Sequence, residues 1–210
     1  MTEQLNKART SPGERAELYG ELCAAAGQCR KCRLCESRKS VVMGEGDINS
    51  PIMFVGEGPG EVEDDTGRPF VGPAGQLLSK ILKVAGFDRQ RVYITNIVKC
   101  RPPQNRVPAI EETIACQRWL EAQIAIINPR IIIALGNTPL KWFLHSTEGI
   151  TKLRGRWLDW RGMDFMAMYH PSYLLRNQSR AKDSPKAQTW LDIQAVKRRY
   201  DEAISERQNV

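Results

Sequence analysis

Residues 52–60 have the sequence IMFVGEGPG, in which four apolar residues lead directly into a glycine-rich turn. A short run without polar residues, closed by such a turn, is typical of a parallel strand that is buried on both faces. Three similar runs follow, and the sequence therefore predicts four buried strands. The other three are VYITNIV at 92–98, IIIAL at 131–135 and FMAMY at 165–169.

Segments with helical spacing separate these runs. Apolar residues stand at 74, 77, 78, 81, 82 and 85, as on an amphipathic helix, and Gly86 is placed to end it. Alternating strands and helices predict an α/β protein: a three-layer α/β/α sandwich around a central, mainly parallel four-stranded sheet. Ligand sites in such folds lie beyond the carboxyl ends of the strands. Further helices are expected at 13–27, up to about 127, up to about 144, and at 185–204.

Length and composition favour an ordinary soluble globular protein with an anionic partner. We expect one domain over residues 1–210, with a frayed tail at 1–12. No apolar run approaches the roughly 20 residues that span a bilayer, and the N-terminus has no apolar signal core, so we expect a cytoplasmic protein. The net charge of +7 favours nucleic acid as a partner, although a merely basic enzyme would also fit.

The cysteines fall into two groups. Cys29 and Cys32 form a C-x2-C pair, and Cys100 and Cys116 follow much later in the chain. In a reducing compartment, clustered cysteines more often bind metal or do chemistry than form disulfides. Cys35 forms a second, overlapping C-x2-C pair with Cys32, and spacing alone allows zinc as well as an iron–sulfur cluster.

Several polar and aromatic residues stand at the expected strand ends. The glycines of GEGPG would let backbone N–H groups approach a ligand, or would simply form a tight turn, and neither phosphate-loop motif is present. Phe70, between two glycines in GRPFVG, is either a core aromatic or a stacking platform for a base. Asn96 offers both a donor and an acceptor, or caps the strand end.

The segment after the last strand, YHPSYLLR, suggests contacts with nucleic acid. His170 could donate a hydrogen bond to a developing oxyanion, or be purely structural. Leu174 and Leu175 would be a wedge into a base stack if exposed, or the start of a helix if buried. Basic residues follow, and they would contact phosphates or form a solvated face: Arg176, Arg180, Lys182 and Lys186.

Taken together and in order, five motifs resemble the family 4 uracil-DNA glycosylases, the iron–sulfur branch of their superfamily. They are GEGPGEVED (56–64), GRPFVGPAGQLL (67–78), VYITNIVKCRPPQNR (92–106), HPSYLLRN (170–177) and TWLDIQ (189–194). The resemblance covers about residues 29–200. It implies hydrolysis of the N-glycosidic bond of deoxyuridine in DNA, which releases uracil and leaves an abasic site for base excision repair.

The resemblance also implies a [4Fe–4S] cluster. The family's second ligand precedes an RL or PL pair, which selects Cys29 and Cys32 with Cys100 and Cys116, and leaves Cys23 and Cys35 spare. The implied partner is uracil-containing DNA, either single- or double-stranded. The protein is expected to be a monomer and to bind no membrane. Leu174 and Arg176 are the implied DNA-binding residues.

For the chemistry, the resemblance implies a flipped deoxyuridine in a pocket at the strand ends. Phe70 would stack on uracil, and Asn96 would match its O4 and N3–H. His170 would stabilise negative charge at uracil O2 as the bond breaks. Backbone groups around Glu57, Gly58 and Gly60 would contact the base.

The water-activating group is the least defined part of this expectation. The family 1 motif GQDPY has Asp and Tyr where this chain has Gly58 and Gly60. Glu57 and, second, Glu63 are the nearest catalytic candidates, and Glu63 could instead be a helix-start anion.

A DNA-crosslinking relative would need a histidine in the loop CRPPQNRVP, which has none. A noncatalytic DNA binder is the other alternative.

Overall fold

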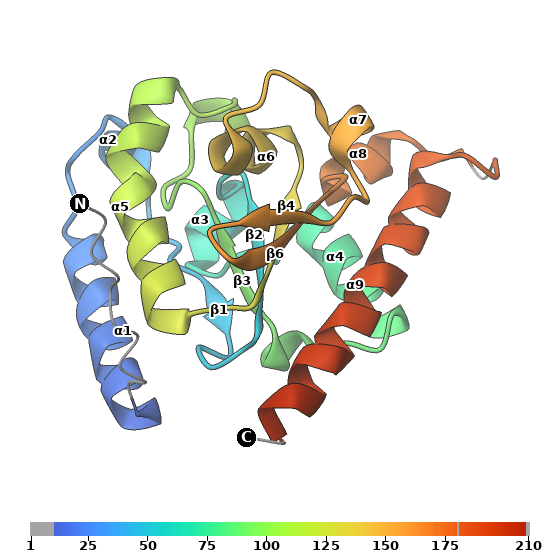
Figure 1. Ribbon diagram of the computed structural model, residues 1–210. Helices are drawn as coiled ribbons and strands as arrows, with labels where there is room; N and C mark the ends of the chain where they lie inside the picture. Colours follow the sequence, from blue (N-terminus) through green and yellow to red (C-terminus); the bar gives the residue numbers. More distant parts are fainter. Residues whose placement is uncertain (1–10, 180, 209–210) are drawn as a thin grey trace.

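The computed structural model, which describes residues 11–179 and 181–208, has a six-stranded sheet between two layers of helices (Figure 1). The predicted α/β/α sandwich is therefore confirmed. The strand order is β1-β3-β2-β4-β6-β5. The strands are β1 (Glu45–Gly46), β2 (Ile52–Gly56), β3 (Tyr93–Asn96), β4 (Ile131–Leu135), β5 (Leu158–Trp160) and β6 (Met163–Met168).

The four predicted strands are the parallel centre of this sheet. β3, β2, β4 and β6 pair in parallel, whereas β1 and β5 pair antiparallel at the two edges. The expected count of four strands was therefore too low. Two or three residues are too few to show a period-two pattern, so the edge strands left no signal in the sequence.

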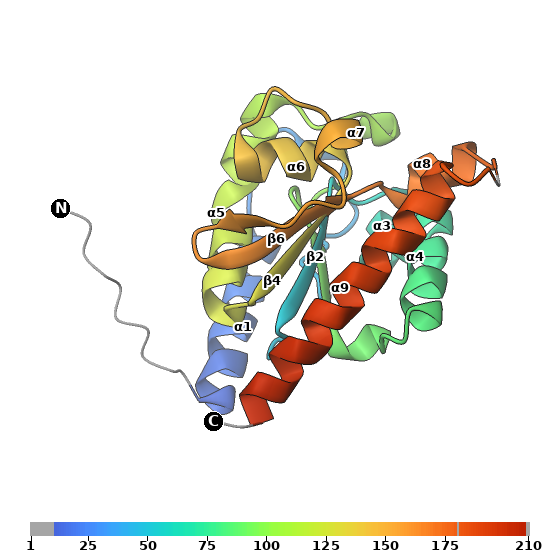
Figure 2. The ribbon, with the colours of Figure 1, turned by 45° about the vertical axis from the view of Figure 1, so that its right-hand side comes forward.

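The helices are divided between the two faces of the sheet, as the views in Figures 1 and 2 show. The longer helices are α1 (Pro12–Gly27), α4 (Pro73–Val84), α5 (Ile110–Ile127), α6 (Asn137–Leu144) and α9 (Pro185–Gln208). The short ones are α2 (Leu34–Ser37), α3 (Glu61–Thr66), α7 (Ile150–Leu153), α8 (Pro171–Arg176), and the 3₁₀ turns η1 (Arg89–Arg91) and η2 (Pro103–Asn105). Alternate residues of β2 face opposite layers: Met53 and Val55 pack in the core with α1, α5 and α6, while Ile52 and Phe54 pack with α4 and α9.

The first helix begins inside the segment that we expected to be frayed. The Ser11 hydroxyl accepts the Glu14 N–H, the Glu14 carboxylate accepts the Ser11 N–H at 2.7 Å, and Pro12 occupies the first turn. The rest of the expected tail, residues 1–10, lies outside the described residues. The single domain over 1–210 stays a prediction. No helix in the ranges 11–179 and 181–208 is long and apolar enough to cross a bilayer.

An enclosed ion pair ties the segment after α7 to α9. Arg154 donates from Nε to Asp192 at 2.8 Å and from Nη2 to the other carboxylate oxygen, and the two side chains are 16% and 4% exposed. Burial raises the pKa of Asp192 even with the guanidinium beside it. Without its partner, this carboxylate would be left desolvated and unpaired.

We therefore expect Arg154→Met to lower the free energy of unfolding by about 3 kcal/mol. Urea unfolding followed by tryptophan fluorescence measures this loss. Lys152→Met is the matched control, because it removes one cation from the exposed pair with Glu148 and should cost less than about 0.5 kcal/mol. Equal losses in the two variants would contradict the importance of the enclosed pair.

Candidate active site

A cavity of about 580 Å³ opens at the carboxyl ends of the central strands. The parallel register sets Gly56, the last residue of β2, opposite Asn96, the last residue of β3. Residue His170 follows β6, so it reaches the same edge. Most of the predicted site residues line this cavity: Glu57, Gly58, Gly60, Glu63, Phe70, Asn96, His170 and Arg176.

Asn96 has an unsatisfied group in the cavity wall. Asn96 is 1% exposed, and no group in the described part of the chain donates a hydrogen bond to its Oδ1. Its backbone carbonyl, by contrast, accepts from Lys99 Nζ at 2.6 Å. A buried amide oxygen without a donor costs about 1–3 kcal/mol, so a ligand N–H at this place would be favoured.

Gly56 allows the Asn96 amide and the Phe70 ring to meet. A Cβ added to Gly56 would lie 2.4 Å from Asn96 Oδ1 and 2.4 Å from Phe70 Cζ. Phe70 is 6% exposed, and its ring centroid lies 5.7 Å from that of His170. Its φ of +52° is in the left-handed region, which costs a non-glycine residue about 1–2 kcal/mol. Other contacts must therefore hold this conformation.

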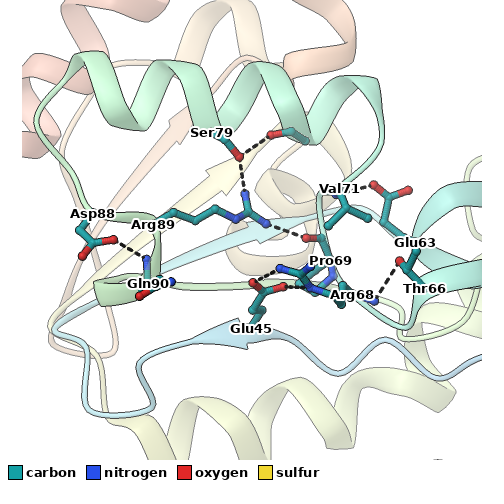
Figure 3. Close-up of polar contacts among 11 residues, drawn as sticks. Glu45, Glu63, Thr66, Arg68, Pro69, Val71, Ser79, Asp88, Arg89 and Gln90 are labelled. Carbon is teal, nitrogen blue, oxygen red and sulfur yellow. Dashed lines mark hydrogen bonds and ion pairs between the residues drawn. The ribbon is translucent and has the colours of Figure 1, made fainter.

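Glu63 is one of these contacts. Its Oε1 accepts the backbone N–H of Val71 at 2.9 Å (Figure 3). It also accepts that of Gly72 at 2.8 Å, so the chain is fixed just after Phe70. Gly72 is the N-cap of α4, so the carboxylate also stands at a helix start, as the alternative interpretation of Glu63 expected. A carboxylate occupied in this way has less capacity to activate water.

Glu57 has a different environment. Its carboxylate accepts a hydrogen bond from the hydroxyl of Thr138, in the first turn of α6. A second cavity of about 440 Å³ lies against the first, and Glu57, His170 and Arg176 line both. Sequence reasoning missed Thr138, because nothing in its local sequence indicates that it faces a residue 81 positions away.

His170 caps α8 with its imidazole. Nδ1 accepts the Ser172 backbone N–H at 3.2 Å and lies 2.8 Å from the Ser172 hydroxyl. A ring nitrogen that accepts an N–H carries no proton, so the neutral tautomer has its proton on Nε2. Burial, helped by the nearby Arg176 cation, lowers the pKa of His170 to about 4. The imidazole is therefore a neutral donor at ordinary pH.

The two leucines of α8 differ from the expectation. Leu174 is 2% exposed and lies against α4 and α9, so its burial argues against Leu174 as a wedge. Leu175 is 39% exposed and lines the cavity. The segment is a helix, as the alternative interpretation expected, and a helix turns adjacent side chains in different directions. Arg176 and Lys182 are exposed, Lys186 donates to Gln178, and Arg180 lies outside the described residues.

The four predicted cysteine ligands surround a small hollow between α1, α2, α5 and the loop after β3. Cys29, Cys32, Cys100 and Cys116 line it together with Cys35, whereas Cys23 is not among its described lining residues. Around no point in the described ranges do three His, Cys, Asp or Glu side chains gather to hold a single metal ion. A cluster needs no such arrangement, because its thiolates bind different irons.

Donors in the hollow point at sulfur. The Lys99 backbone N–H lies 3.3 Å from Cys116 Sγ, and Arg38 Nη1 lies 3.2 Å from Cys100 Sγ. Burial raises the pKa of Cys116 to about 11, so enclosure alone disfavours the thiolate and a bound metal would have to supply the compensation. Hydrogen bonds to sulfur are what a thiolate-ligated group requires, and the residues present therefore fit such a group.

Comparison with known proteins identifies relatives over most of the chain. The sequence model of the uracil DNA glycosylase superfamily matches residues 43–194. A type-4 uracil-DNA glycosylase of Thermotoga maritima is 52% identical over 79% of this chain and 87% of its own length. Type-4 uracil-DNA glycosylases of Sulfurisphaera tokodaii and Saccharolobus solfataricus are 44% and 43% identical over 73% and 70% of this chain, and 74% and 70% of their own lengths.

The low pKa of His170 leads to a prediction for titration. Its imidazole should stay neutral, protonated on Nε2, until the pH falls to about 4. Because this value lies below the usual 6.5, the neutral imidazole contributes stability that is present above pH 6.5 and is lost as the pH falls to about 4. ¹⁵N NMR titration, with the signal assigned by its loss in His170→Gln, measures the pKa of His170 and shows which ring nitrogen carries the proton. Titration near pH 6.5 would contradict the prediction.

Proposed function

The chain belongs to the type-4 branch of the uracil DNA glycosylase superfamily, and we propose that it hydrolyses the N-glycosidic bond of deoxyuridine in DNA. The products are free uracil and an abasic site, which begins base excision repair. The observation that carries this proposal is the unpaired Oδ1 of Asn96 beside the Phe70 ring at the strand ends. An amide and an aromatic face together suit a flipped, planar base.

Uracil recognition follows from the amide of Asn96. Its Oδ1 accepts from uracil N3–H and its Nδ2 donates to O4. The buried Oδ1, which has no donor among the described residues of the free protein, is then satisfied by uracil. Cytosine has a bare N3 and an amino group at position 4, so it would leave both amide groups unsatisfied. Phe70 stacks on the base, and backbone groups of Glu57, Gly58 and Gly60 contact its remaining edge.

Bond cleavage depends on stabilising the uracil anion. The Nε2–H of His170 donates to O2 as negative charge develops there, and a fixed dipole of this kind lowers the barrier without any proton transfer. The bond from sugar C1′ to uracil N1 breaks with its electron pair going to uracil, and water attacks the resulting sugar cation.

Glu57 is our first candidate for the group that assists this water. It borders both cavities, and its hydrogen bond from Thr138 limits how the carboxylate can turn. Negative charge at this place would also stabilise the sugar cation. Glu63 remains the second candidate, although its Oε1 already accepts two backbone N–H groups.

DNA binding uses the rim of the cavity. Arg176 contacts a phosphate, and Leu175 takes the place proposed for Leu174 as the apolar residue that enters the base stack. With a net charge of +7, the protein binds uracil-containing DNA in single- and double-stranded form as a monomer. We place the reaction in the cytoplasm, where clustered thiols stay reduced.

Cys29, Cys32, Cys100 and Cys116 would hold a [4Fe–4S] cluster, with Cys35 and Cys23 spare. The cluster would supply structural cross-linking rather than a step of the hydrolysis. Cys100 follows Asn96 by four residues, so fixing its sulfur also restrains the strand end that reads the base.

Uracil release is the direct test. Purified protein should release free uracil from single- and double-stranded oligonucleotides without added metal, leave the abasic strand intact, and release nothing from RNA. Asn96→Asp should lower kcat/KM by about 100-fold, about 2.7 kcal/mol, because a carboxylate cannot donate to O4. Asn128→Asp, an exposed cap of α5, is the control with the same charge change. Tight DNA binding without uracil release would favour the noncatalytic alternative.

The cluster has a spectroscopic signature. Freshly purified protein should absorb in a broad band near 400 nm that dithionite or acid bleaches, with about four irons for each chain. Cys116→Ser should lose the band, whereas Cys23→Ser should keep it. Colourless protein with stoichiometric zinc would show that the thiols hold a different metal.

A further inference from the structure

Arg89 connects η1 to the loop that carries Phe70 (Figure 3). Its Nη2 donates to the carbonyl of Pro69 at 2.7 Å, and its Nη1 donates to the hydroxyl of Ser79 at 2.9 Å. Ser79 in turn donates to the carbonyl of Gly75 at 2.9 Å. The guanidinium therefore links the loop to the first turns of α4.

The two peptide groups on either side of Phe70 are both held by side-chain hydrogen bonds. Arg89 holds the carbonyl of the peptide that precedes Phe70, and Glu63 holds the N–H of the peptide that follows it. Rotations φ and ψ of Phe70 are the rotations between these two peptides. One cation and one anion thus fix the left-handed conformation of Phe70, and with it the direction of the ring.

Gly75 completes the arrangement. A Cβ on Gly75 would lie 1.9 Å from the carbonyl carbon of Phe70, so α4 can approach the loop this closely only with glycine at that position. Arg89 and Glu63 hold the Phe70 loop through hydrogen bonds on either side of Phe70, and the missing side chain of Gly75 leaves space for the loop against α4.

Arg89 is used in an unusual way for an arginine. It is half-buried, and in the described part of the chain both of its hydrogen-bond acceptors are neutral oxygens. Burial lowers its pKa. The nearby Glu45 carboxylate instead pairs with Arg68, at 2.8 and 3.0 Å. Removing the Arg89 guanidinium from water costs free energy, and a neutral carbonyl offsets this cost less than a carboxylate would. We take this as a sign that the position of the Pro69 carbonyl matters.

We propose that Arg89 is a positioning residue for uracil recognition: it fixes the Pro69–Phe70 peptide so that the Phe70 ring forms the wall on which the base stacks. The inference rests on the proposed function and deepens it. Without Arg89, Phe70 relaxes towards negative φ, and its ring turns away from Asn96 and His170.

A double-mutant cycle on uracil release tests this assignment. Arg89→Met should lower kcat/KM by about 10- to 100-fold in the wild-type background and by less than about twofold in the Phe70→Ala background, because Arg89 acts through that ring. Arg89→Lys should recover part of the loss, since one donor can still reach the Pro69 carbonyl. Arg91→Met is the control, because it removes one cation from the same 3₁₀ turn at an exposed residue.

A purely structural role would give equal losses in both backgrounds, and that result would overturn the proposal. A second measurement does not depend on activity. The chain has five phenylalanines, so ¹⁹F NMR of fluorophenylalanine-labelled protein gives few signals, and Phe70→Leu assigns the one needed. Arg89→Met should shift or broaden that signal, and Arg91→Met should not. An unchanged signal would refute the inference even in a protein that releases no uracil, whereas a shifted signal without release would count against the proposed function alone.

Discussion

The register of β2 against β3 is the constraint on which the candidate site depends. Parallel pairing sets Gly56 opposite Asn96, so both strands end at the same level. Because the side-chain period of a strand is two, a slip by one residue would turn Asn96 to the other face of the sheet. The missing Cβ of Gly56 then decides how closely the amide and the Phe70 ring approach. β2, β3 and β4 are buried along their whole length, so a shift of register would misplace packed side chains on both faces of the sheet.

A buried polar network supports the same strand end from below. The ammonium of Lys99, 1% exposed, donates to Thr95, to the carbonyl of Asn96 and to Gln123 at 2.6–2.7 Å. All three acceptors are neutral, and burial lowers the pKa of Lys99 to about 7. The next residue, Cys100, lines the hollow of the cysteines. The segment from Asn96 to Cys100 is therefore held by the buried Lys99 amine and by the hydrogen bond from the Lys99 N–H to Cys116 Sγ, and it borders both the cavity and the hollow.

The sequence predicts the parts of this protein that depend on local pattern. Apolar runs located the four parallel strands to within about two residues, because complete burial leaves an uninterrupted signal. The family motifs selected residues that line one cavity, as expected where the carboxyl ends of parallel strands meet. The short α8 was only the alternative interpretation of this segment, and the opposite burial of Leu174 and Leu175 was not predicted. The contacts of Glu57 with Thr138 and of Arg89 with Pro69 join residues 81 and 20 positions apart, and no local pattern encodes such pairs.

The distribution of charge in the pocket fits the reaction that we propose. Uracil leaves as a delocalised anion, so it needs hydrogen-bond donors at fixed positions more than it needs a strong acid. A neutral His170 meets this need, because burial disfavours the imidazolium while the Ser172 N–H orients the ring. Fixed positions in turn require a rigid pocket. Glu63 and Arg89 supply this rigidity, because they hold the peptides on either side of Phe70. The departure of uracil thus depends on fixed donors rather than on proton transfer to the base, and the charges of Glu63 and Arg89 act by holding the loop around it.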